Sequence, residues 1–79
     1  MSLIAQRDSV LKTMFYIWDD KDPEENTIAK VYKLDKGLNA GWRWERFDTD
    51  EKMVGIVYRA DAFRTLEKSF DRVITILEN

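Results

Sequence analysis

The chain has 79 residues, of which 44% are hydrophobic and 35% are charged, and its formal net charge at pH 7 is −2. A chain of this length forms one domain, so we expect residues 1–79 to fold as a single unit. It contains no Cys and no His. Their absence excludes disulfides, thiolate metal sites and the commonest general base. The acidic balance also argues against a strongly electrostatic nucleic-acid binder.

Motifs that carry catalysis are missing as well. Ser2, Ser9 and Ser69 lack the Gly-x-Ser-x-Gly context of a serine nucleophile, and the sequence holds no Gly-rich phosphate loop. We therefore expect no enzyme and no cofactor. No stretch approaches the ~18 apolar residues of a membrane span, and residues 1–8 do not resemble a signal peptide. The expected location is cytoplasmic, with no membrane partner.

The first third of the chain predicts one strand and an acidic turn. Residues 2–9 are polar and ambiguous, and we expect them to be irregular or a short helical turn. Residues 10–18 (VLKTMFYIW) are rich in β-branched and aromatic side chains, which favours a strand. Residues 19–26 hold five acids and the only Pro. They lack the Asp-x-Asp-x-Asp-Gly spacing of a calcium loop, so we expect a solvated turn and no metal site.

Residues 27–35 (TIAKVYKLD) predict a second strand because Thr, Ile, Val and Tyr dominate the segment. A helix is the alternative. Asp22 at the N-cap and Pro23 at the first helical position would start a helix that runs to Leu34.

The remaining residues predict two strands and a helix. Residues 36–41 hold two glycines and predict a turn. Residues 42–47 (WRWERF) and 53–59 (MVGIVYR) predict the third and fourth strands, with Gly55 marking a bulge or a close approach of another backbone segment. Residues 61–77 predict an amphipathic helix. The expected fold class is α+β, with a four-stranded, curved antiparallel sheet followed by one long C-terminal helix.

Apolar residues spaced three and four apart form one stripe along the predicted helix, from Phe63 to Leu77. Such a stripe can pack on the sheet, pair with a second copy or dock another partner. The stripe is wider than the sheet alone needs, so we expect a homodimer. The predicted interface consists of Leu66, Phe70, Val73, Ile74 and Leu77.

Residues 42–47 interleave aromatic side chains with cations, a pattern typical of surfaces that stack bases and hold phosphates. Side chains alternate between the two faces of a strand. Trp42 and Trp44 therefore share one face, which we expect to be core. Arg43 and Phe47 share the other face, which is the better candidate for function.

Several short motifs between residues 27 and 70 resemble those of one known family. In chain order they are Ala29-Lys30-Val31-Tyr32-Lys33, Arg43-Trp44-Glu45-Arg46-Phe47, the acidic loop from Asp48 to Lys52, Gly55-Ile56, Asp61-Ala62-Phe63, and Leu66. In this order they resemble the single-stranded-DNA-binding domain of the transcriptional coactivators known as positive cofactor four. That family places four antiparallel strands before one helix.

The resemblance implies a homodimer whose C-terminal helices pair and whose sheets form grooves for single-stranded DNA or RNA. It implies that Phe47 and Phe63 stack on bases. The phosphate contacts that it implies are Lys30, Lys33, Arg43, Arg46, Lys52 and Arg59. The implied role is an accessory protein in transcription or replication.

A second hypothesis is a small protein-interaction or inhibitor module that uses the acidic turn or the aromatic face and binds no nucleic acid. An exposed Phe47 on a basic face favours the first hypothesis. A buried Phe47 beside a dominant acidic face favours the second.

Overall fold

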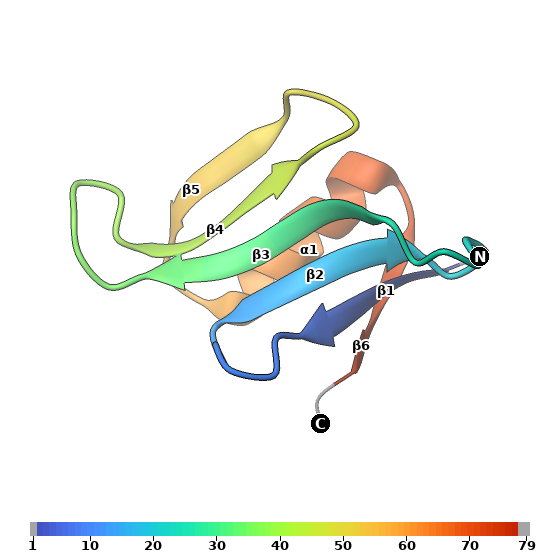
Figure 1. Ribbon diagram of the computed structural model, residues 1–79. Helices are drawn as coiled ribbons and strands as arrows, with labels where there is room; N and C mark the ends of the chain where they lie inside the picture. Colours follow the sequence, from blue (N-terminus) through green and yellow to red (C-terminus); the bar gives the residue numbers. More distant parts are fainter. Residues whose placement is uncertain (1, 78–79) are drawn as a thin grey trace.

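The computed structural model describes residues 2–77, which form one sheet with a helix packed on one side of it (Figure 1). The elements are β1 (Ser2–Arg7), β2 (Met14–Asp19), β3 (Thr27–Leu34), β4 (Gly41–Arg46), β5 (Lys52–Ile56), α1 (Arg59–Phe70) and β6 (Val73–Leu77). The strand order across the sheet is β5-β4-β3-β2-β1-β6.

The first five strands form an antiparallel meander, and β6 then pairs in parallel with β1. A parallel neighbour needs a crossover connection, which α1 supplies between β5 at one edge of the sheet and β6 at the other. The α+β class expected from the sequence is therefore right. The expected four-stranded antiparallel sheet is wrong, because the sheet has six strands and is mixed.

Both additional strands lie at the ends of the described chain. Residues 2–9, expected to be irregular, contain β1, in which Leu3 and Ala5 are buried. The predicted helix 61–77 begins earlier, at Arg59, and ends at Phe70. It ends there because Asp71 adopts a left-handed conformation (φ 55°) that turns the chain out of the helix. Residues 73–77 (VITIL) are mostly β-branched and form a strand instead.

The strand predicted over residues 10–18 is present as β2 but starts later than expected, at Met14. Residues before it are held in a turn, because the Asp8 carboxylate accepts the backbone N–H groups of Val10 and Leu11 at 2.9 and 2.7 Å. The strand predicted over 27–35 is present as β3. The helical alternative is wrong, because the Asp22 carboxylate closes a local turn by accepting backbone N–H groups from Glu24 and Asn26.

The hydrophobic core lies between the sheet and α1. Phe15 and Phe63 meet there edge to face, with ring centroids 5.2 Å apart. Trp44 lies in the same layer, and its indole N–H donates to Thr65 Oγ1 of the helix at 2.9 Å. The other buried members are Leu3, Ala5, Ile17, Ala29, Val31, Ala62, Leu66 and Ile74. Within residues 2–77, no helix combines the length and apolar character needed to span a membrane.

Candidate binding face on the open side of the sheet

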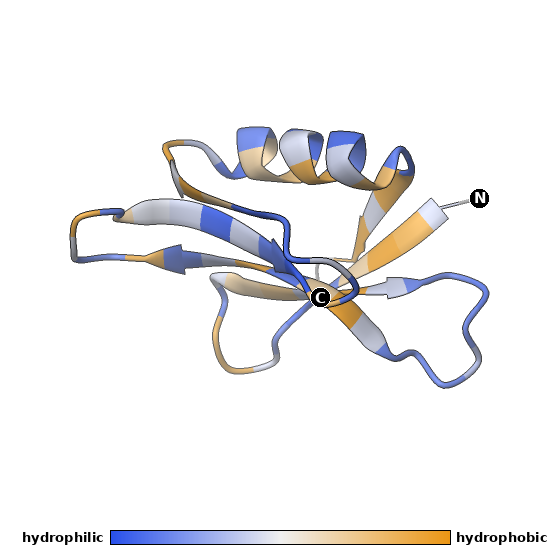
Figure 2. Cartoon of the chain, turned by 90° about the horizontal axis from the view of Figure 1, so that it is seen from above, coloured by the Kyte–Doolittle hydropathy of each residue, from blue (hydrophilic) through white to orange (hydrophobic). Residues whose placement is uncertain are grey.

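Only one face of the sheet carries the helix. Viewed from above, α1 lies along one side, and no helix or strand among residues 2–77 covers the other side (Figure 2). Because side chains alternate along each strand, the residues between the core positions point to this uncovered side. We call it the open face. Its polar and aromatic members on β2 to β5, with the residue after β4, include Tyr16, Trp18, Lys30, Tyr32, Arg43, Glu45, Phe47 and Lys52.

Tyr32 lies at the centre of the open face. The Lys30 ammonium is 4.9 Å from the Tyr32 ring centroid, and the Arg43 guanidinium is 5.5 Å from it. The Tyr32 hydroxyl donates to Glu45 Oε1 at 2.6 Å. Burial, and secondly this hydrogen bond to a carboxylate, raise the pKa of Tyr32. The ring therefore holds two cations over one region of the sheet.

The cations of this face lack acidic partners. Among the residues that the structure describes, Lys30, Arg43 and Lys52 form no ion pair. Arg43 Nε is also buried without a hydrogen-bond partner, which costs free energy unless a ligand or water satisfies it. Glu45 is the one carboxylate among the open-face residues named above. Together with the three cations, it gives these residues a net charge of +2.

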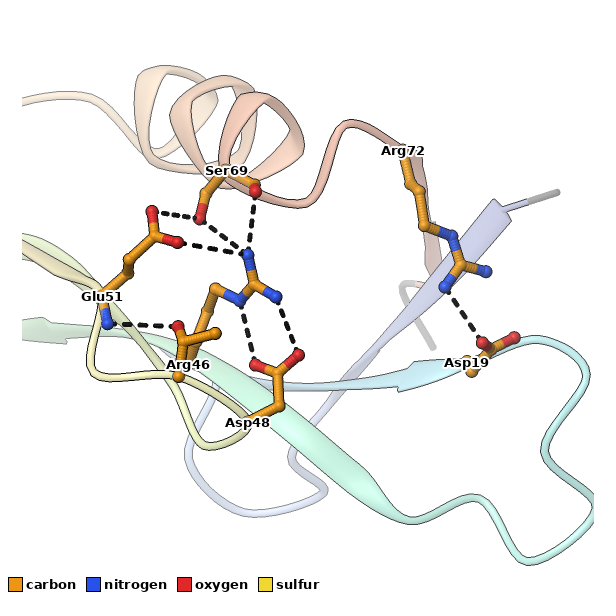
Figure 3. A network of polar contacts seen from close by, with 7 residues as sticks. Asp19, Arg46, Asp48, Glu51, Ser69 and Arg72 are labelled. Atoms are coloured by element: carbon orange, nitrogen blue, oxygen red, sulfur yellow. Dashed lines mark hydrogen bonds and ion pairs between the residues drawn. The ribbon is translucent and has the colours of Figure 1, made fainter.

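Arg46 points the opposite way, and its guanidinium is fully engaged beneath the helix (Figure 3). It donates to both carboxylate oxygens of Asp48, at 2.9 and 2.7 Å, and to the Ser69 carbonyl oxygen at 2.8 Å. Glu51 lies 3.5 Å from it, and the Phe70 ring centroid lies 3.8 Å from its Cζ. The hydrogen bond from Arg46, and to a lesser degree its positive charge, lower the pKa of Asp48. Arg46 therefore joins the helix C-terminus to the β4–β5 loop.

The sheet separates the predicted nucleic-acid contacts into two groups. Lys30, Arg43, Phe47 and Lys52 lie on the open face, where Phe47 is 53% exposed and its ring centroid is 6.0 Å from the Lys30 ammonium.

The other four predicted contacts lie elsewhere. Phe63 is 5% exposed and packs in the core against Phe15, so stacking of a base on it is incompatible with this fold. Arg59 lies over the Phe15 ring at 5.5 Å, on the helix side. Lys33 alternates onto the helix side near the end of β3, and Arg46 is engaged beneath the helix.

The predicted dimer residues no longer share one helix stripe. Leu66 and Ile74 are buried within this chain, and Phe70 packs against the core. Their burial corrects the expectation that one long helix presents all five to a second copy. Val73 and Leu77 belong to β6 and remain 65% and 37% exposed.

Sequence reasoning missed the two tyrosines of the open face. Tyr32 lies two residues after Lys30 on β3, so the two-residue alternation of that strand already places Tyr32 on the same face as Lys30. Tyr16 pairs across strands with Lys30, and its hydroxyl donates to Asp8 Oδ1 at 3.0 Å. That hydrogen bond raises the pKa of Tyr16.

The acidic turn holds itself together through local contacts. Asp19 accepts the Lys21 backbone N–H and an Arg72 side-chain N–H, at 2.9 and 3.0 Å. Asp22 accepts two backbone N–H groups. Within residues 2–77, no three acidic side chains lie close enough together to hold a metal ion.

Comparison with known proteins finds no family model, no curated protein and no solved structure that matches the chain.

Proposed function

We propose that the protein binds single-stranded nucleic acid across the open face of its sheet. The observation that carries the proposal is the contrast between the two sides. Arg46 and Arg72 on the helix side have carboxylate partners. Lys30, Arg43 and Lys52 on the open face have none within the described chain, and an exposed Phe47 lies beside them.

Each residue has a role in the proposed complex. Phe47 stacks on a base, which every base permits because every base has a π-face. Lys30, Arg43 and Lys52 contact phosphates through charge-assisted hydrogen bonds. Tyr32 positions Lys30 and Arg43 but has two cations at its ring, so Phe47 is the better stacking surface.

The broader role follows the resemblance described above. We propose a non-catalytic accessory protein of transcription or replication that acts as a homodimer in the cytoplasm. The motifs on β3 and β4 support this role. The difference between the six-stranded sheet and the four-stranded fold of that family counts against a shared binding geometry.

A fluorescence-anisotropy titration with a labelled single strand of about 20 nucleotides tests the proposal, since one folded ssDNA-binding module covers roughly 4–16 nucleotides. We expect binding that is tighter for the single strand than for the same sequence as a duplex. Phe47→Ala should weaken binding about five- to a hundredfold, because stacking contributes about 1–3 kcal/mol per base. Leu38→Ala removes a fully exposed apolar side chain elsewhere and should leave binding unchanged.

No binding of the wild-type protein at low salt would reject the nucleic-acid function. The alternative hypothesis, a protein-interaction module, would then be favoured. Equal losses for Phe47→Ala and Leu38→Ala would reject the open face as the site.

A further inference from the structure

The two edges of the sheet differ in how regular they are. On β5, the pairing with β4 shifts register between Trp42 and Trp44, and Gly55 adopts a positive φ of 69°. Such irregularity and an edge Lys, here Lys52, discourage strand addition. The β6 edge is regular and carries no charged residue from Val73 to Leu77. A regular, uncharged and largely β-branched edge is a template for another strand.

The backbone groups available on β6 can be identified from one contact. The Ile74 N–H donates to Glu67 Oε2 at 2.8 Å rather than to β1. It therefore points away from β1. Because successive residues of a strand direct their N–H and C=O groups to opposite sides, Ile74 and Ile76 face outward, while Val73, Thr75 and Leu77 face β1. Glu67 covers one of the outward donors.

The sequence of β6 is complementary to itself in one antiparallel register. A two-fold axis at Thr75 places Val73 opposite Leu77 of a second copy, Ile74 opposite Ile76, and Thr75 opposite its equivalent. Ile74 and Ile76 are the outward-facing residues, so each of these two pairs exchanges both backbone hydrogen bonds. Apolar residues of one copy then contact apolar residues of the other on both faces of the sheet, and Thr75, the one polar residue of β6, contacts Thr75 of the second copy.

We propose that β6 is the interface between two copies of this chain, which pair antiparallel about Thr75 and join their sheets into one. The inference rests on the proposed homodimer but not on nucleic-acid binding. An isologous interface requires a self-complementary surface, and β6 has one in both backbone and side chains. Glu67 must release the Ile74 N–H when the strands pair.

The charges beside the edge are compatible with this pairing. A hollow of about 380 Å³ between α1 and β6 is lined by both signs of charge. Its charged residues are Arg64, Lys68 and Arg72, with Glu67 and Asp71. A mixed set of this kind lets acidic groups of one copy face basic groups of the other across a two-fold axis, whereas a set of one sign would repel its own copy.

Disulfide trapping tests the register directly, because the chain has no cysteine. Directly opposed residues in a non-hydrogen-bonded antiparallel pair have Cα atoms about 4.5 Å apart, within the range that a disulfide accepts. Thr75→Cys should cross-link into a covalent dimer under mild oxidation. Thr27→Cys, at an exposed position on interior strand β3, is the matched control and should cross-link at least about tenfold more slowly, since it lacks a preformed partner.

Sedimentation velocity provides the complementary test. Wild type should be dimeric in the micromolar range. Thr75→Lys should be monomeric at the same concentration, because two like charges would face each other at the two-fold axis. Thr27→Lys should remain dimeric. Circular dichroism should show that all three proteins are folded.

The outcomes separate two kinds of failure. A monomeric wild type rejects the homodimer itself. A dimeric wild type with a dimeric Thr75→Lys and no selective Thr75→Cys cross-link shows that two copies pair by another surface, which rejects the β6 interface alone.

Discussion

Arg43 and Arg46 are close in sequence but lie on opposite sides of β4. Arg46 has a side chain that is only 11% exposed, beside Asp48 and Glu51. Arg43 stacks on Tyr32, has no ion pair within the described chain and leaves Nε without a hydrogen-bond partner. An arginine side chain thus stabilises the fold at position 46 and is available to a ligand at position 43.

This difference predicts opposite consequences for two matched variants. Arg46→Ala should lower the free energy of unfolding by on the order of 1–3 kcal/mol, because it removes charge-assisted hydrogen bonds and leaves the partly buried Ser69 carbonyl oxygen without its donor. Arg43→Ala should lower it by less than about 1 kcal/mol, because it removes a single cation–π contact and also removes a buried donor that has no hydrogen-bond partner. Urea denaturation measures both, and similar losses for the two variants would contradict the assignment.

At the scale of elements, one ion pair joins distant parts of the chain. Arg72, in the connection between α1 and β6, donates to Asp19 at the end of β2 (Figure 3). This hydrogen bond, with a second from the Lys21 N–H, lowers the pKa of Asp19 to about 2. The contact helps hold the chain at the point where it leaves the helix and enters β6.

The lowered pKa predicts a loss of stability in acid. The pKa of an unfolded Asp is about 3.9, so the contribution of Asp19 is present above about pH 4 and lost as the pH falls towards about 2. Urea midpoints measured between these pH values should fall. Asp19→Asn should flatten part of that slope, and Arg72→Met should flatten the same part because it removes the main cause of the shift. An unchanged slope in both variants would show that the pair does not contribute.

At the scale of the whole molecule, the distribution of charge matters more than its sum. The chain is acidic, with a net charge of −2, yet the open-face residues defined above carry a net of +2. The acidic turn 19–26 repels phosphates, so we expect micromolar rather than nanomolar affinity for a single strand.

Salt dependence measures how many phosphates the open face neutralises. Three cations at about 0.7 each give a log–log slope of about −2 for single strands. Lys52→Ala should reduce that slope by less than about one unit, whereas Lys68→Ala, which removes an exposed cation from α1 on the other side, should leave it unchanged. A slope near zero, or equal effects of the two variants, would argue against phosphate contacts on this face.

Local patterns in the sequence determined the α+β class, the interior strands and the division of β4 into a tryptophan face and an Arg43–Phe47 face. These features depend on β-branched and aromatic runs and on two-residue alternation, which neighbouring residues specify. The tertiary structure decided which face the helix covers, and therefore that Phe63 is core while Phe47 is exposed. It also decided the state of the segment VITIL, which fits a helical stripe and a β-strand equally well. That segment becomes β6 because Asp71 ends the helix and β1 offers a partner edge, a long-range pairing that local periodicity does not encode.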